Sequence, residues 1–238
     1  MATPGLGAEA PRVARAFQER VLACGVEPVN RLEVAVEAKL AEIRSMEEAP
    51  AADFAAAQDH LLEAVVASRP YRPELRTSLD AAVIRGILRE ARAGHLGPAD
   101  LPGVAERLSA GPQEVRIDLA AELLHAAAPD RIALLSRWVW NPTRRTGILA
   151  EFGGAPPETY LGTQGRLAEI RLELEALGFR GTSFASVDVL LALTYAGRLS
   201  EAVDRSFQGG GIERLLPGAY PLATIVLGVR RRLKHADR

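Results

Sequence analysis

The chain has 238 residues and a mass of 25.5 kDa, a length that suits one large domain or two small ones. Hydrophobic residues make up 48% of it and charged residues 25%, with 29 basic side chains against 30 acidic ones. This composition excludes a disordered, collagenous or highly charged chain. A chain of this length can bury a sizeable core without a disulfide or a metal ion.

The cysteine content and the apolar segments predict a cytoplasmic protein. Cys24 is the only cysteine, so no disulfide can form within one chain. Residues 1–10 lack the basic and apolar regions of a secretion signal, and we expect them to form a disordered N-terminal tail. The strongly apolar stretches 187–196 and 219–229 are about half the ~20 residues that a membrane-spanning helix needs. We therefore expect no membrane association.

In the first part of the chain, apolar side chains recur with the 3.6-residue period of an α-helix. Asn30 and Glu33 have the spacing of a capping box and predict a helix start there. Prolines open two of the later segments, at a position where their missing N–H costs least. The predicted helices cover 13–24, 30–46, 54–66, 75–88, 98–109 and 112–128, and a further one is capped by Asp130 and runs to Trp138 or Trp140.

Residues 141–165 break the helical pattern with several glycines and prolines. We interpret this segment as a loop or linker between an N-terminal helical subdomain at 11–140 and a C-terminal one at 166–238. Residues 147–152 are the one candidate strand. Their apolar side chains, Ile148, Leu149 and Phe152, are expected to be exposed.

Helical periodicity resumes at Leu167 and predicts a solvated helix that ends at Gly178. The segment 187–196 is apolar on every side, so we expect a buried central helix there, ended by Gly197. A polar helix through Phe207, a glycine loop at 209–211, a turn at 212–216 and a final helix from about 220 to 233 follow. No internal repeat is present. The sequence thus predicts an all-α protein, an irregular multi-helix bundle of about ten helices with a long Pro/Gly-rich excursion in the middle.

The most distinctive segment is 131–145, which holds four arginines, no acidic residue and both tryptophans of the chain. Indole faces and guanidinium groups can together hold a single nucleic-acid strand or another anion, and the same side chains are common anchors at protein interfaces. A third interpretation is structural, with Trp138 in the core and Trp140 on a turn. The candidate binding residues are Arg137, Trp138, Trp140, Asn141, Arg144 and Arg145.

Metal and enzyme motifs are weak or missing. Glu122 and His125 have the Glu-x-x-His spacing of carboxylate-bridged metal sites, but no second copy exists. We therefore predict no metal site and place His125 at a helix periphery. Phosphate-loop, dinucleotide-binding and nucleophile-elbow motifs are absent, so no cofactor and no catalytic residue is predicted. If the protein is an enzyme of unknown reaction, Arg137, Trp140, Arg144 and Arg145 are the first candidates to surround an anionic substrate.

Charge is uneven along the chain: residues 1–63 carry eleven acids and six bases, whereas 214–238 carry six bases and one acid. Opposite charges of this kind can orient two segments or two molecules. All but two of the basic residues are arginines, the exceptions being Lys39 and Lys234. Our first functional hypothesis is a non-catalytic interaction or scaffold subunit with a protein partner or a second copy of itself. The alternatives are binding of nucleic acid or another anion through 131–145, and an enzyme.

Overall fold

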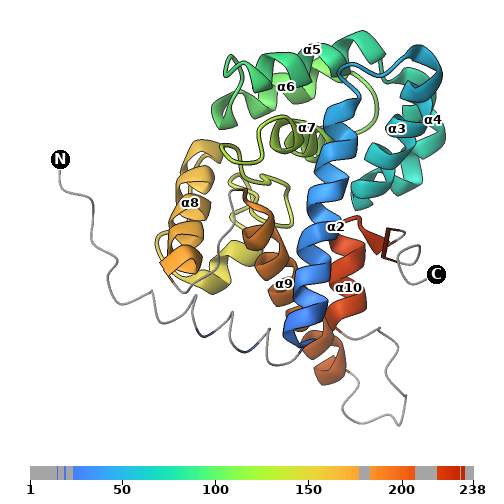
Figure 1. Cartoon of the computed structure of the whole chain (residues 1–238). Coiled ribbons are helices and arrows are strands. Elements are labelled where there is room, and N and C mark those ends of the chain that lie inside the picture. Colours follow the sequence, from blue (N-terminus) through green and yellow to red (C-terminus); the bar gives the residue numbers. More distant parts are fainter. Residues whose placement is uncertain are drawn as a thin grey trace.

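The computed structural model describes residues 24–176, 183–206, 219–230 and 232–233, together with Arg15 and Glu19. Within these residues the protein is all-α, with nine α-helices, three short 3-10 helices and no strand (Figure 1). The elements are α2 (Val26–Ser45), α3 (Ala51–Ala64), η1 (Val66–Tyr71), α4 (Arg72–Ser78), α5 (Ala81–Arg92), η2 (Pro98–Asp100), α6 (Leu101–Arg107), α7 (Gln113–Ala127), η3 (Ile148–Phe152), α8 (Tyr160–Ala176), α9 (Ala185–Ser206) and α10 (Ala219–Val226). The predicted fold class is confirmed. None of these helices has both the length and the apolar character that crossing a bilayer requires.

Helix α7 is the most deeply buried element of the fold. It packs against α2, α5 and α6 and also touches α3 (Figure 1). Because it is covered on several sides, its polar side chains Asp118, Glu122 and His125 are buried along with its apolar ones. Every buried polar group of this helix therefore needs a partner from another element.

A second group of helices forms around α9, which packs against α2, α8 and α10. The predicted burial of 187–196 is confirmed except at Tyr195, which is only partly covered. The predicted stop at Gly197 is wrong, because α9 continues through this residue to Ser206. Glycine lowers helix stability by only about 1 kcal/mol, which packing on both sides can offset.

Two predicted helix boundaries in the first half are corrected by the structure. Helix α2 begins at Val26, so Asn30 lies inside it and does not cap it. The single helix predicted at 75–88 is two helices, α4 and α5, separated by an extended backbone at Leu79. The side chain of Asp80 accepts a hydrogen bond of 2.7 Å from the Ala82 N–H and so starts α5.

The segment between α7 and α8 is irregular but lies against the core. The helix predicted from Asp130 does not form, and residues 147–152 form η3 instead of a strand. Ile148, Leu149 and Phe152 are only 4%, 2% and 1% exposed, so the expectation that they face solvent is wrong. Backbone N–H groups of Ile148 and Leu149 donate to the carbonyls of Trp138 and Val139, so η3 is hydrogen-bonded to an earlier part of the same irregular segment. Helix α8 starts at Tyr160, earlier than predicted.

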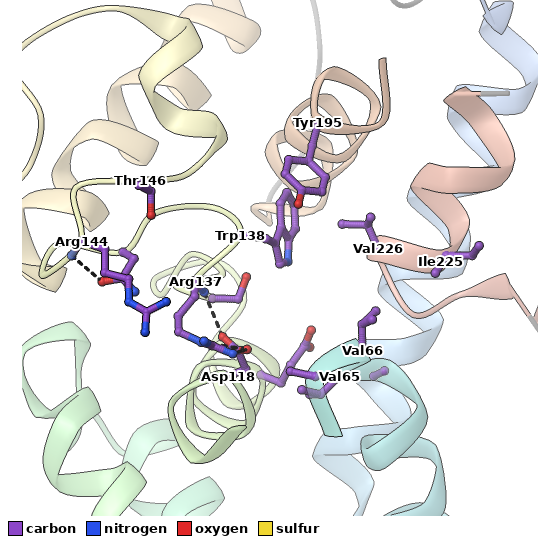
Figure 2. Close-up of a pocket in the computed structure, with 15 residues that line it drawn as sticks. Val65, Val66, Asp118, Arg137, Trp138, Arg144, Thr146, Tyr195, Ile225 and Val226 are labelled. Atoms are coloured by element: carbon purple, nitrogen blue, oxygen red, sulfur yellow. Dashed lines mark hydrogen bonds and ion pairs between the residues drawn. The ribbon is translucent and has the colours of Figure 1, made fainter. Parts of the chain in front are cut away.

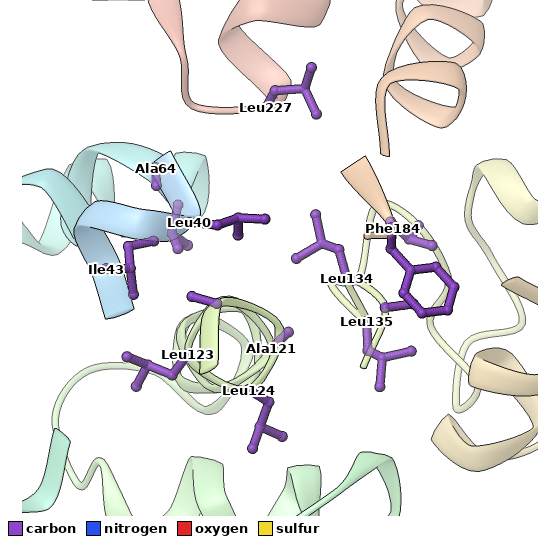
Figure 3. Close-up of a cluster of buried hydrophobic side chains, with 14 of the residues drawn as sticks. Leu40, Ile43, Ala64, Ala121, Leu123, Leu124, Leu134, Leu135, Phe184 and Leu227 are labelled. Atoms are coloured by element: carbon purple, nitrogen blue, oxygen red, sulfur yellow. The ribbon is translucent and has the colours of Figure 1, made fainter. Parts of the chain in front are cut away.

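One cluster of buried side chains includes residues from both halves of the chain. Around α7, Figure 3 shows Leu40 and Ile43 of α2 on one side and Leu134 and Leu135 on the other, with Phe184 next to the latter. The predicted division into subdomains at 11–140 and 166–238 stays a prediction about folding units. The predicted tail at 1–10 lies outside the described residues, as do Gly178, Phe207, the glycines at 209–211 and the turn at 212–216; of the helix at 13–24 only three residues are described.

The helix predicted from about 220 to 233 is interrupted: α10 ends at Val226, the chain turns at Gly228, and helical backbone resumes at Arg230 and at 232–233. Gly228 has a φ of 70°, and a Cβ at this position would lie 2.4 Å from the Cα of Ala64. Only glycine fits this left-handed conformation and this close approach. The turn brings the residues after α10 against the end of α3, where Arg232 forms an ion pair with Glu42 of α2. The acidic and basic ends of the chain thus attract each other within one molecule here.

Candidate functional site

A pocket of about 400 Å³ lies between the middle of α7, the segment after it, η1 and the last helices. Figure 2 shows Trp138 and Tyr195 on one side, and Val65 and Val66 at the start of η1 with Ile225 and Val226 across from them. Arg137 and Arg144 lie toward a third side, beside Asp118. The full lining is Ala64, Val65, Val66, Ala67, Asp118, Glu122, Ser136, Arg137, Trp138, Asn141, Arg144, Thr146, Tyr195, Ile225 and Val226. Its size falls in the range of small-molecule sites, roughly 300–1,000 Å³.

The acidic side of the pocket comes from one face of α7. Glu114, Asp118 and Glu122 follow one another at four-residue spacing, so they lie in a row along the helix. The row runs from an exposed end, where the Glu114 side chain is 52% exposed, to a buried one, where that of Glu122 is 5% exposed. Each carboxylate has a basic partner from elsewhere in the chain.

Asp118 positions the irregular segment that carries the arginines. Its Oδ1 accepts a 2.9 Å hydrogen bond from the Arg137 backbone N–H, and its Oδ2 accepts from Nε and Nη2 of the same residue. Burial raises the pKa of Asp118, and the hydrogen bonds and charge of Arg137 only partly oppose this. Burial together with the nearby Asp118 charge raises the pKa of Tyr160. The Asp118 carboxylate is therefore held close to the core by its hydrogen bonds with one residue, Arg137.

At the buried end of the row, Lys39 of α2 forms an ion pair with Glu122 of α7. Lys39 Nζ donates to Oε1 at 3.1 Å and lies 3.0 Å from Oε2, and its side chain is fully buried. Glu122 Oε2 nevertheless accepts no hydrogen bond, and the hydroxyl of Ser136, also buried, has no partner among the described residues. Both residues line the pocket. Unsatisfied polar atoms on residues that line a cavity are typical of a place where water or a ligand completes the hydrogen bonds.

The open side of the pocket carries an aromatic pair and an arginine side chain that is held in an ion pair. The rings of Trp138 and Tyr195 are 5.8 Å apart between centroids and tilted by 49°. The Arg144 side chain is 66% exposed and donates from Nη2 to Glu114 at 2.6 Å, and the Arg144 backbone N–H donates to Asn141 Oδ1. Glu114 also lies 3.3 Å from the Arg137 guanidinium. Acidic and basic groups thus balance around the pocket.

The structure brings four of the six predicted binding residues to this pocket: Arg137, Trp138, Asn141 and Arg144. Trp140 and Arg145 instead line a separate cavity of about 270 Å³ against residues 149–157. Trp140 is only 2% exposed, and its Nε1–H donates to the carbonyl of Pro157 at 2.8 Å. The indole of Trp140 therefore offers no free face for stacking, and the four-residue anionic-substrate site drawn from sequence is split between two cavities.

Four lining residues of the pocket were not predicted from the sequence: the acidic residues Asp118 and Glu122, and also Ser136 and Tyr195. The signal that could have found the acids is their regular spacing with Glu114 in a helix rich in apolar residues. Ser136 and Tyr195 carry no such signal, because only the packing of distant segments places them here.

Glu122 and His125 do not act as a metal pair. His125 is fully buried, not peripheral as predicted, with its Nε2 2.9 Å from Asp188 Oδ2 and its Nδ1 2.6 Å from the Ile132 carbonyl oxygen. Both partners are acceptors, so both ring nitrogens carry hydrogens and the imidazole is charged. The described part of the chain contains no group of three or more His, Cys, Asp or Glu side chains placed to hold a metal ion.

No protein-family model, no curated protein and no solved structure matches the chain. The interpretation of the pocket therefore depends on its own geometry.

Proposed function

We propose that the protein binds a small molecule in the pocket between α7, η1, α9 and α10. The observation that carries this proposal is a pair of buried polar atoms that accept no hydrogen bond, Ser136 Oγ and Glu122 Oε2, beside a cavity walled by aromatic and branched side chains; Oε2 has only the Lys39 ammonium next to it. Leaving a buried polar group without a hydrogen bond costs about 1–3 kcal/mol. A bound molecule that donates hydrogen bonds to these two atoms would recover that cost.

The walls define the shape of this molecule. The Trp138–Tyr195 pair on one side and Val66 with Val226 on the other favour a flat body that packs between them. Glu122 favours an N–H or O–H group at one edge of the ligand. We therefore infer a planar heteroaromatic compound with hydrogen-bond donors at one edge.

The charge balance of the site favours an uncharged compound over a nucleic-acid strand or another polyanion. Arg137 is neutralised by Asp118 and Arg144 by Glu114. An incoming phosphate would have to displace these carboxylates from the guanidinium groups before it could pair with them. Anion binding by the segment 131–145 is therefore the weaker alternative for this pocket.

A fragment screen tests the proposal. Ligand-observed NMR with uncharged heteroaromatic compounds, with indole and adenine as the first probes, should detect binding to the wild type. The Ser136→Leu variant fills the polar end of the pocket and should abolish the signals. Ser78→Leu makes the same change at an exposed helix end and should leave them unchanged.

If no planar fragment binds the wild type, or if Ser136→Leu binds as well as Ser78→Leu, the proposal fails. Thermal melting of each variant shows whether it is folded. A melting temperature of Ser136→Leu near that of the wild type assigns a loss of binding to the pocket.

A second candidate function is the interaction subunit expected from the sequence. The side chains on which that expectation relied, Ile148, Leu149 and Phe152, are buried, but Leu161 and Leu172 are each 60% exposed on α8. Eleven residues, about three helical turns, separate them, so they lie on one face. We expect light scattering to show self-association that Leu161→Glu removes; a strictly monomeric wild type would contradict a homo-oligomer.

A further inference from the structure

Three arginines converge on a further cavity, of about 260 Å³, which is distinct from the candidate pocket and from the cavity beside Trp140. Arg69 comes from η1, Arg72 from the start of α4 and Arg230 from the residues after α10. One carboxylate, Glu63 near the end of α3, completes the charged lining, and Gly228 forms part of the wall. We call these three side chains the arginine cluster.

Local structure explains why these side chains meet. Pro70 lies inside η1, between Arg69 and the start of α4, and restricts the backbone at this turn. The left-handed turn at Gly228, against the backbone of Ala64, brings Arg230 back to the end of α3. The cluster is therefore built from three segments by the fold, not by a run of basic residues.

The charges of the cluster are not balanced. Arg72 Nη1 lies 3.7 Å from Glu63 Oε1, at the outer limit of an ion pair, and Arg72 Nε is buried without a hydrogen-bond partner. Burial lowers the pKa of Arg69, and the neighbouring charges of Arg72 and Arg230 lower it further, whereas Glu63 opposes them. Among the described residues that line this cavity, three guanidinium groups face one carboxylate, an excess of two positive charges.

We propose that the arginine cluster binds the phosphate group of a small molecule, either inorganic phosphate or a phosphomonoester. A phosphate dianion would neutralise the excess charge and offers acceptor oxygens to several guanidinium groups at once. The cavity is several times the ~30 Å³ that one water molecule occupies, so a phosphate and the first atoms of an ester fit inside it.

This site is independent of the small-molecule pocket. The segment η1 separates the two, since Val66 lines the pocket and Arg69 lines the cluster cavity. No lining residue is shared between them. Failure of the fragment screen would leave the phosphate proposal standing, and the reverse also holds.

Isothermal titration calorimetry at low ionic strength tests the proposal, with inorganic phosphate in one arm and glycerol phosphate in the other. We expect the wild type to bind at least one of them. Arg69→Gln and Arg230→Gln remove charge from exposed positions and should each weaken binding by about tenfold or more. The control is Arg76→Gln, on α4 but paired with Asp59 and outside the cavity, which should bind as the wild type does.

Binding of one compound alone distinguishes a free phosphate site from a site for an ester. The proposal is overturned if neither compound binds, or if the two cluster variants and Arg76→Gln bind equally well. It is also overturned if a single-stranded oligonucleotide binds through these arginines while both small phosphates fail. Circular dichroism melting curves confirm that each variant is folded.

Discussion

Helix α7 contributes to two buried ion pairs, His125–Asp188 and Glu122–Lys39, which contain similar groups in opposite situations. Around His125, both ring nitrogens are satisfied by Asp188 and the Ile132 carbonyl, and both side chains of the pair are almost completely buried. Around Glu122, an equally buried ion pair borders a pocket, and two polar atoms are left without hydrogen bonds. Buried charge therefore does not by itself mark a site; incomplete hydrogen bonding beside a cavity does.

The largest effect should come from breaking the Lys39–Glu122 pair. Lys39→Met leaves the Glu122 carboxylate buried without its cation, and we expect a loss of about 3–5 kcal/mol in the free energy of unfolding. Urea denaturation measures this loss. The double variant Lys39→Met/Glu122→Leu should recover most of it, because two apolar side chains can replace a buried ion pair. A single variant as stable as the wild type would show that pocket water already solvates the carboxylate.

At the His125–Asp188 pair, Asp188→Asn should cost about 1.5–3 kcal/mol at pH 6. This is less than for Lys39→Met, because His125 can release its proton and asparagine still accepts a hydrogen bond. Burial alone would lower the pKa of His125, but the charge and hydrogen bond of Asp188, with the Ile132 carbonyl, raise it above its ordinary value.

Because the pKa of His125 is raised, the loss of stability in Asp188→Asn should depend on pH, and the direction of that dependence follows from the raised pKa. The folded protein holds the His125 proton more tightly than the unfolded chain does. The stabilisation is complete below the unfolded pKa of about 6.5 and is lost as pH rises through the higher folded value. The difference between wild type and Asp188→Asn should therefore shrink from pH 6 to pH 9. The exposed variant Asp59→Asn serves as the control, and a difference independent of pH would contradict a charged His125.

A smaller effect, of opposite sign, is expected beside the pocket. Ser136→Ala removes a buried hydroxyl that has no partner, so the free energy of unfolding should stay the same or rise by up to about 1 kcal/mol. The same variant should weaken fragment binding in the pocket. If it is destabilised by more than 1 kcal/mol, the hydroxyl already has a partner in the empty protein.

The smallest effect belongs to the exposed rim. Arg144 is 66% exposed and its ion pair with Glu114 faces solvent, so Arg144→Ala should change the free energy of unfolding by less than about 0.5 kcal/mol. Thermal melting at low and high salt is a sufficient measurement. A larger loss would mean that Arg144 holds the segment 141–146 in place through its side chain.

Much of the helical framework could be predicted from periodicity alone. The helix 112–128 and the buried stretch 187–196 were found because their patterns depend on neighbours within a few turns. Residues 148–152 were misread, since a segment rich in glycine and proline has no period that reveals whether it lies on a core. Its burial is decided by contacts with other segments.

The candidate site was only half predicted for the same reason. Arg137, Trp138, Asn141 and Arg144 stand out by composition within one segment. Their acidic counterparts do not, because Asp118 is 19 residues from Arg137 and Glu114 is 30 residues from Arg144. A pairing at such separations leaves no local trace in a single sequence.

Because Lys39 is buried between α2 and α7, its chemical reactivity should report when these two helices separate. Lysine amines react with acylating reagents only when they are accessible, and the chain has just one other lysine, Lys234. Acylation at Lys39 would therefore count the molecules in which α2 has separated from α7. Mass spectrometry of a pulse-labelled sample could then follow the stability of this contact in a cell extract, without purification or an attached dye.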